Sequence, residues 1–181
     1  MEKNPISIVL GASAFAAHKH RDQRRKGAEA SPYINHPIAV ANVLANEAYV
    51  TDPVILAAAL LHDTIEDTDT TADELTAEFG AGIAEIVLEV TDDKSLPKQD
   101  RKRLQIEHAA ALSEKAKLVK LADKICNLRD MNQSPPVDWS TERKAEYFAC
   151  AKQVVDPMRG VSPTLEALFD AAFANGRSAS R

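Results

Sequence analysis

The sequence has few of the residues that stabilise small secreted folds, and it has no long uninterrupted apolar run. It contains only two cysteines in 181 residues, and Cys126 and Cys150 are too few and too far apart for a disulfide framework or a zinc ribbon. Reduced thiols, as in a cytoplasmic protein, are therefore expected. No segment approaches the roughly 18 uncharged apolar residues that a membrane-spanning helix needs. These shortages argue against a disulfide-rich secreted protein and against a membrane protein.

The first apolar segment, residues 6–17, has the length of a signal-peptide core but not its surroundings. Glu2 offsets the charge of Lys3, and serine and glycine residues interrupt the apolar run. Asn4 followed by Pro5 is instead typical of a helix N-cap with proline at the first helical position. We therefore expect this segment to be the first helix of a cytoplasmic protein.

Positive charge is scarce overall and clustered locally. The chain has 22 Lys and Arg against 27 Asp and Glu, a net charge of −5, which argues against a dedicated nucleic-acid binder. The basic residues nevertheless gather within residues 19–26, 94–103 and 115–124. Such stretches in an acidic protein fit a small polyanionic ligand, although solvated helix faces would have the same composition.

Helical periodicity runs through most of the chain, and no segment alternates like a strand. Asp52 and Pro53 open a helix whose interior, residues 54–61, is wholly apolar and belongs in the centre of a bundle. Further helices are expected at about 37–48, 71–80, 83–90, 98–113, 118–128, 140–155 and from 163, with residues 175–181 frayed. The pattern predicts one all-α bundle domain over residues 1–181, with its core in about 5–172.

A polar cluster follows directly after the most apolar part of the sequence. His62 and Asp63 are an imidazole and a carboxylate suited to a divalent transition metal, and burying them unpaired would cost several kcal/mol, roughly. If the central helix continues, Glu66 and Asp67 lie one turn further along the same surface. Carboxylates placed there could orient a metal-activated water and move protons. Alternatively, these acidic residues only close the helix.

Two distant segments offer matching ligands. His36 stands before Pro37 at a loop-to-helix junction, and Asp123 lies on an amphipathic helix one turn before Asn127, with Lys120 one turn earlier. A solvated polar face is the alternative for Asp123, but the apolar residues close to that face argue against it. The other histidines lie among charged residues and are expected at the surface: His18, His20 and His108.

The combined motifs resemble a known family. They are residues 24–26 (RRK), 33–37 (YINHP), 58–68 (AALLHDTIEDT), 89–94 (EVTDDK), 117–124 (KLVKLADK) and 127–130 (NLRD). Together they cover roughly residues 10 to 155 and are similar to the HD-domain hydrolases of the Rel/Spo alarmone family, especially the free-standing small alarmone hydrolases of the metazoan SpoT-homologue type. The resemblance implies an all-α HD-domain bundle, without the synthetase and regulatory domains of the long bifunctional enzymes.

The resemblance also implies a chemistry. One Mn²⁺ would be bound by His36, His62, Asp63 and Asp123, with Glu66 and Asp67 as the catalytic carboxylates. The implied reaction removes pyrophosphate from the ribose 3′ position of guanosine 3′-diphosphate 5′-diphosphate (ppGpp) or its pentaphosphate relative, leaving GDP or GTP. Expected substrate contacts are Arg25, Lys26 and Asn127 from the resemblance, Tyr33 as a base or sugar contact, and Lys94, Lys98, Arg101 and Arg129 as phosphate contacts suited to diphosphates.

Two alternatives stay open from the sequence. The same metal site could act on an adenosine alarmone or on the 2′-phosphate of NADPH, since only base and sugar contacts distinguish these substrates. A non-catalytic nucleotide sensor could keep the fold, although every metal ligand and both catalytic carboxylates of the motif are present.

Overall fold

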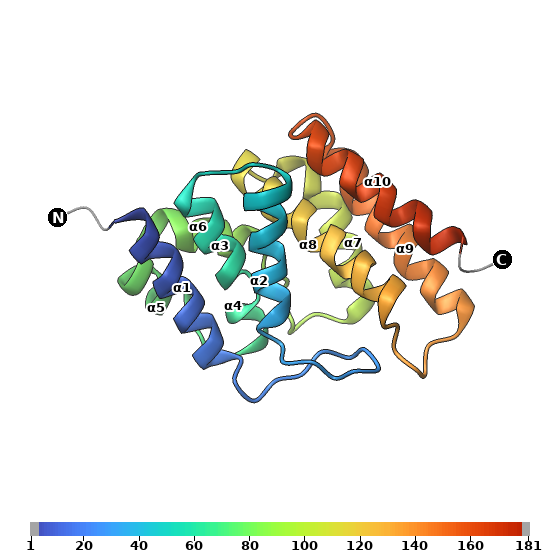
Figure 1. Cartoon of the computed structure of the whole chain (residues 1–181), viewed down its shortest axis with the longest axis horizontal. Helices are drawn as coiled ribbons and strands as arrows, with labels where there is room; N and C mark the ends of the chain where they lie inside the picture. The colour runs from blue at the N-terminus through green and yellow to red at the C-terminus, as the bar shows by residue number, and fades with distance from the viewer. Residues whose placement is uncertain (1–3, 179–181) are drawn as a thin grey trace.

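A computed structural model describes residues 4–178, and this part of the chain is helical (Figure 1). The α-helices are α1 (Pro5–Lys19), α2 (Asn35–Asn42), α3 (Pro53–Leu61), α4 (Thr64–Asp67), α5 (Ala72–Phe79), α6 (Ala81–Val90), α7 (Lys98–His108), α8 (Glu114–Gln133), α9 (Thr141–Val155) and α10 (Pro163–Ser178). A π-helical segment, η1 (Val43–Glu47), and two 3₁₀ turns, η2 (Ala109–Ala111) and η3 (Asp156–Met158), extend α2, α7 and α9. The predicted all-α class is confirmed, and none of the described helices is long and apolar enough to cross a membrane.

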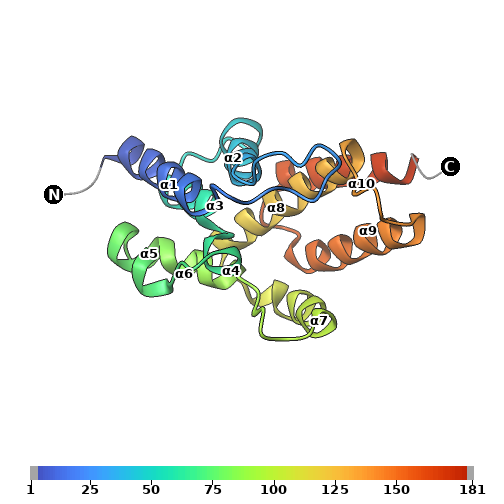
Figure 2. The ribbon, with the colours of Figure 1, turned by 90° about the horizontal axis from the view of Figure 1, so that it is seen from below.

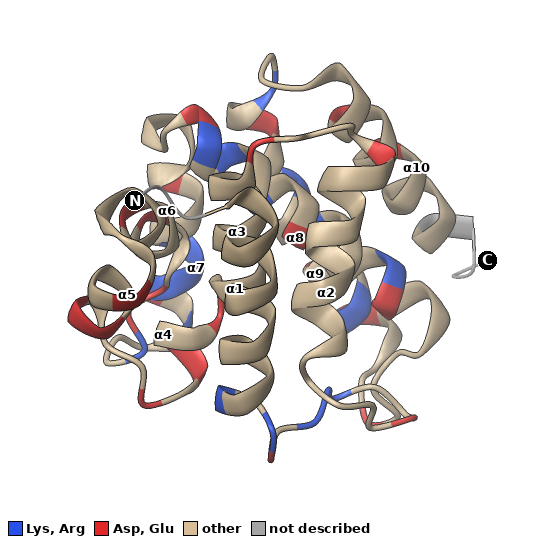
Figure 3. Ribbon diagram, turned by 60° about the vertical axis from the view of Figure 1, so that its left-hand side comes forward, with Lys and Arg blue, Asp and Glu red and all other residues tan. Residues whose placement is uncertain are grey.

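Helices α3 and α8 form the middle of the bundle. Both contact α2 on one side and α6 on the other, as the view from below shows (Figure 2). Helix α1 packs on α3, while α9 and α10 pack on α8. The ribbon of α3 carries no charged residue (Figure 3), and its residues 57–61 are all buried. Burial on every side explains why its sequence is apolar all round.

Local capping signals place most helix starts as predicted. The side chain of Asn4 accepts a hydrogen bond from the Ile6 amide at 2.9 Å, and Asp52 accepts one from Val54 at 2.9 Å. Ser140 caps α9 in the same way, and Thr71 caps α5, which ends at Gly80. Each cap satisfies an amide that the first helical turn leaves without a partner.

The central helix is interrupted at the polar cluster, so the expectation that it continues through Asp67 is wrong. Helix α3 ends at Leu61, and α4 begins at Thr64, whose hydroxyl donates to the Leu61 carbonyl at 2.7 Å. Side chains of this type compete with the helical hydrogen bonds. Adjacent residues on an unbroken helix point in different directions, and the turn lets His62 and Asp63 face the same point.

The last helix continues further than predicted. Helix α10 runs through Ser178, so fraying from residue 175 is not observed, and residues 179–181 lie outside the described part. The reason is its apolar face: Phe169 and Ala172 are buried, and Phe173 packs against Phe148. The side chain of Asn132 in α8 also donates to the Ala172 carbonyl at 2.9 Å.

The loop between α1 and α2 closes against the end of α8 at Gly27. A Cβ at this position would lie 2.6 Å from the backbone oxygen of Ser134, so Gly27→Ala should lower the free energy of unfolding by about 1–3 kcal/mol through overpacking. Gly82 in α6 has open space around it, and Gly82→Ala should instead stabilise the helix by about 0.5–1 kcal/mol. Urea unfolding of both variants tests the contact, and a wild-type midpoint for Gly27→Ala would show that the loop does not need it.

Candidate metal centre and adjoining groove

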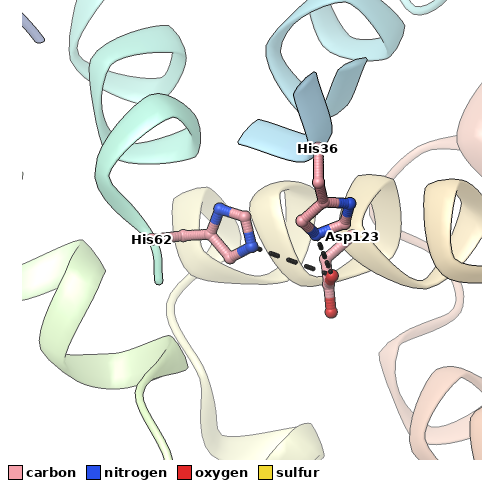
Figure 4. A group of neighbouring side chains, drawn as sticks. All are labelled: His36, His62 and Asp123. Carbon is pink, nitrogen blue, oxygen red and sulfur yellow. Dashed lines mark hydrogen bonds and ion pairs between the residues drawn. The ribbon is translucent and has the colours of Figure 1, made fainter. Parts of the chain in front are cut away.

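Three side chains, from α2, α8 and the turn after α3, point toward one another in the middle of the bundle (Figure 4). His36 lies in the first turn of α2, His62 follows α3, and Asp123 lies midway along α8. The Nε2 atoms of His36 and His62 are 3.1 and 3.8 Å from Oδ1 of Asp123. All three residues are buried, and their nearest ligand atoms lie within 4.8 Å of one another.

Asp63 joins this group from the turn after α3. Its Oδ2 atom lies 3.2 Å from Nε2 of His62 and 3.8 Å from Nε2 of His36. The structure therefore brings together all four residues that the sequence nominates as metal ligands. His62 and Asp63 together form the turn between α3 and α4.

The hydrogen bonding of His62 suits a metal ligand. Its Nδ1 atom lies 2.8 Å from the carbonyl oxygen of Ala59 and must be the donor, because a carbonyl only accepts. When the ring is neutral, as a metal ligand must be, its lone pair lies on Nε2, which is buried and has no hydrogen-bond partner among the described residues. A backbone carbonyl holding the other nitrogen is the usual way in which proteins orient such a ligand. Two imidazoles and two carboxylates around one point fit a divalent cation.

The electrostatics of the centre also favour positive charge. Burial opposes the charged form of His62, but the carboxylates of Asp63 and Asp123 outweigh it and raise the pKa of His62 to about 10. Burial likewise favours neutral carboxyl groups, yet the imidazoles hold the pKa of Asp63 below its usual range, and Lys124 and the imidazoles do the same for Asp123. The two aspartates therefore stay ionised around a point that attracts a cation.

Glu66 lies one turn after His62, in α4. Its Oε2 atom accepts a hydrogen bond from the Asp92 amide at 3.2 Å. Burial raises the pKa of Glu66, and the nearby charge of Asp92 adds to that rise. A carboxyl group whose pKa is moved toward neutrality, beside a cation site, is well suited to proton transfer.

Asp67 is held from both sides. The Tyr33 hydroxyl lies 2.7 Å from Oδ2 of Asp67 and 2.7 Å from Oδ2 of Asp63, so it links a candidate catalytic group to a candidate ligand. Lys94 forms an ion pair with Oδ1 of Asp67. Asp67 thus has a fixed orientation at the edge of the metal centre.

His20 is buried, so its predicted surface position is wrong. Only 1% of it is exposed, its ring stacks on Tyr33 with centroids 4.8 Å apart, and its Nδ1 atom lies 2.7 Å from the side-chain oxygen of Gln23. Gln23 in turn donates to the backbone oxygen of Asp67. The charged neighbours of His20 in the sequence gave no sign of this packing. The other two histidines expected at the surface are exposed: His18 and His108.

The candidate residues line two connected spaces. A cavity of about 160 Å³ contains the four candidate ligands, Glu66 and Asp67, and a groove of about 1330 Å³ adjoins it. Both spaces are lined by Arg25, Tyr33, Asp67 and Asn127. Arg25 donates to Asn127 at 2.9 Å and to Asp130 at 2.7 Å, and its guanidinium lies over the Tyr33 ring.

The predicted phosphate contacts divide into two groups. Lys26 and Lys98 line the groove, and Lys94 stands beside it through its ion pair with Asp67. Arg101 and Arg129 line neither space. Arg129 is instead held by both oxygens of Glu47, at 2.7 and 2.8 Å, on the side of η1.

Sequence reasoning missed several residues that line these spaces. The cavity also contains Asp92, Gln105, Lys120 and Lys124, and the groove contains Trp139, Arg143 and Tyr147. A signal for the two lysines was present, because each is a charged residue within the apolar part of α8 and both lie within one turn of Asp123. No comparable spacing marks the groove residues.

Comparison with known proteins agrees with this geometry. A family model of the HD domain matches residues 12–148. The human guanosine-3′,5′-bis(diphosphate) 3′-pyrophosphohydrolase MESH1 is 59% identical over 158 residues, which cover 87% of this chain and 88% of the human protein. The Xenopus tropicalis protein of the same name is 54% identical over 167 residues, covering 92% and 93%.

Two solved structures are also similar to this chain. The structure of a metazoan SpoT orthologue described as hydrolysing ppGpp matches with a TM-score of 0.91 and 48% identity, over 96% of this chain and 97% of that one. The Listeria monocytogenes protein lmo0812 matches with a TM-score of 0.65 and 26% identity, over 83% and 99%. With its family model, its relatives and its His–Asp centre in agreement, this chain belongs to the HD domain family.

Proposed function

We propose that this protein is a Mn²⁺-dependent guanosine-3′,5′-bis(diphosphate) 3′-pyrophosphohydrolase that acts in the cytoplasm as a single domain. The observation that carries the proposal is that one small cavity contains four metal-ligand candidates, Glu66 and Asp67, and adjoins a groove whose lining includes Arg25, Lys26 and Lys98. The similarity to the vertebrate MESH1 proteins supports the substrate. Both cysteines are free, which suits a reducing compartment.

His36, His62, Asp63 and Asp123 would hold one Mn²⁺. Mixed nitrogen and oxygen ligands of this kind suit Mn²⁺ among the divalent transition metals. When bound, the ion supplies a Lewis acid for the phosphoryl group and lowers the pKa of a water. The protein itself fixes the ligand directions through the Ala59 carbonyl at His62 and the Tyr33 hydroxyl at Asp63.

The carboxylates beside the metal centre would handle the protons of the hydrolysis. The oxygen of water forms a bond to the phosphorus attached to the ribose 3′-oxygen, that P–O bond breaks, and the 3′-oxygen takes up a proton. Glu66, with its raised pKa, takes the proton from the attacking water, and Asp67 orients that water. The products of ppGpp are then GDP and pyrophosphate.

The groove would hold the nucleoside and its 5′-diphosphate. Arg25, Lys26, Tyr33, Lys98 and Asn127 line it. Burial lowers the pKa of Lys98, and the neighbouring charges of Lys102 and Arg143 lower it further. Cations that repel one another in this way attract a polyanion. The arginine fork of Arg25 suits a phosphate or the face of a base.

Product analysis tests the proposal directly. Anion-exchange chromatography after incubation with ppGpp and Mn²⁺ should show GDP and pyrophosphate, and a chelator should stop the reaction. NADPH and the adenosine analogue of ppGpp serve as competing substrates in parallel reactions. Intact ppGpp together with conversion of NADPH to NADH would overturn the substrate, and no turnover of any of them would overturn the enzymatic role.

A further inference from the structure

Two lysines line the cavity, Lys120 buried and Lys124 partly buried, and neither is a candidate metal ligand or a candidate catalytic group. Lys120 and Lys124 lie on successive turns of α8, four residues apart and therefore on the same side of the helix. Lys120 is 8% exposed, and the side chain of Lys124 is 14% exposed. Burial of two like charges next to each other is costly unless anionic groups compensate them.

Partners within the described residues satisfy these ammonium groups only in part. The Nζ atom of Lys120 donates to the Val90 carbonyl at 2.9 Å, and its nearest carboxylate, Asp92, is 3.9 Å away. The Nζ atom of Lys124 lies 3.4 Å from the side-chain oxygen of Gln105 and 3.6 Å from Oδ2 of Asp123. An ammonium group has three donors. Among these contacts, the bond from Lys120 to the Val90 carbonyl is the one short hydrogen bond. Both ammonium groups therefore keep N–H donors available at the cavity wall.

Each nearby carboxylate directs one oxygen toward a lysine, at 3.9 Å for Asp92 and 3.6 Å for Asp123, and uses its other oxygen for other partners. Oδ2 of Asp92 accepts from Gln105, and the Asp92 backbone amide holds Glu66. Oδ1 of Asp123 faces His36 and accepts from Asn127. The pKa of Lys120 is lowered by burial and then by the charge of Lys124, which reflects the repulsion between the two cations. Burial also opposes the charge of Lys124, but Asp123 and other nearby groups outweigh it and raise the pKa of that lysine. An additional anion between them would relieve that repulsion.

We infer that Lys120 and Lys124 form a subsite for the pyrophosphate group that the reaction releases. This inference rests on the proposed function, since the 3′-diphosphate must enter the cavity to meet the metal centre. At about 160 Å³ the cavity is smaller than the 300–1,000 Å³ typical of sites for drug-sized ligands, so it accepts an inorganic anion and leaves the nucleoside in the groove. Lysine ammonium groups bind phosphate oxygens as point charges.

Calorimetric binding of inorganic pyrophosphate to the Mn²⁺-loaded protein tests the subsite without turnover. Lys120→Gln retains a donor for the Val90 carbonyl but removes the charge, and it should weaken pyrophosphate binding about 10- to 100-fold. Binding of GDP, which lacks the 3′-diphosphate, should stay within about threefold of the wild type. Lys115→Gln removes an exposed lysine at the start of the same helix and serves as the matched control, with wild-type affinity for pyrophosphate.

A second variant keeps the test decisive if Lys120→Gln does not fold. Lys124→Gln should cause a comparable loss of pyrophosphate affinity, and Mn²⁺ binding is measured beside it because Lys124 is close to Asp123. Wild-type pyrophosphate affinity in a folded lysine variant would overturn the subsite. If the wild type fails to hydrolyse ppGpp but binds pyrophosphate in a Lys120-dependent manner, the proposed function fails and the subsite stands.

Discussion

Replacing Asp123 by asparagine should abolish both metal binding and activity while the fold remains. The carboxylate faces both imidazoles, and its loss removes charge from the point where the cation would bind. Loss of the metal would remove several kcal/mol of transition-state stabilisation, so kcat/KM should fall by more than about 10³-fold. Saturating Mn²⁺, at 100 times its Kd, should raise the Tm of the wild type by about 5–10 °C and leave the variant unchanged.

Asp73→Asn is the matched control for this variant. Asp73 is an exposed aspartate in the first turn of α5, so the same chemical change there should leave the metal-induced rise in Tm intact. Calorimetric titration with Mn²⁺ should give one binding site per chain in the wild type and in Asp73→Asn. Wild-type Mn²⁺ affinity in Asp123→Asn would show that Asp123 is not a ligand.

Glu66→Gln should separate catalysis from metal binding. Glutamine keeps the size of the side chain and can still accept from the Asp92 amide, but it cannot take up a proton from water. Because general acid–base catalysis typically contributes about 10²–10⁴-fold, kcat should fall by that factor with KM and Mn²⁺ affinity nearly unchanged. Steady-state kinetics with ppGpp and calorimetry with Mn²⁺ give the two readouts.

Glu85→Gln provides the comparison for this second variant. Glu85 is exposed on α6, and its change should leave kcat within about twofold of the wild type. A Glu66→Gln enzyme with wild-type kcat would exclude Glu66 as the proton acceptor. A fall in Mn²⁺ affinity would instead assign Glu66 to the metal.

Local signals in the sequence were enough to predict much of the fold. The caps at Asn4, Asp52, Thr71 and Ser140 act through hydrogen bonds to amides two or three residues away, so neighbouring residues alone determine them. The apolar residues 57–61 likewise show that α3 is central, because no polar face is left for solvent.

Long-range partners could not be predicted in the same way. Arg129 was expected at phosphate, but Glu47, 82 positions earlier, binds it with both carboxylate oxygens. His20 is surrounded by charged residues in sequence, yet its stacking on Tyr33 buries it. In each case the deciding contact joins residues of different helices or loops. Their distance in space cannot be derived from a single sequence.

The helix break at the His–Asp pair is an intermediate case. The dipeptide alone was a weak signal, and its position directly after an apolar run made it informative for metal binding, but a continuous helix would have directed His62 and Asp63 to different sides. The hydroxyl of Thr64, which bonds back to Leu61, was the available local sign of the break. The chemistry of the site was therefore easier to predict than the backbone that arranges it.

The candidate metal ligands lie on buried segments of the bundle, so the amides near them should be protected from hydrogen exchange. His36, His62 and Asp123 are at most 8% exposed and lie on segments around α3 and α8, whereas Gly27 and Ser134 on the groove belong to surface connections. Amides near the ligands should exchange only through openings close to global unfolding, while those of residues 21–33 and 134–140 should exchange by local opening. The metal-ligand end of the site would then keep its geometry for as long as the protein stays folded. The groove end would open and close many times in the same period.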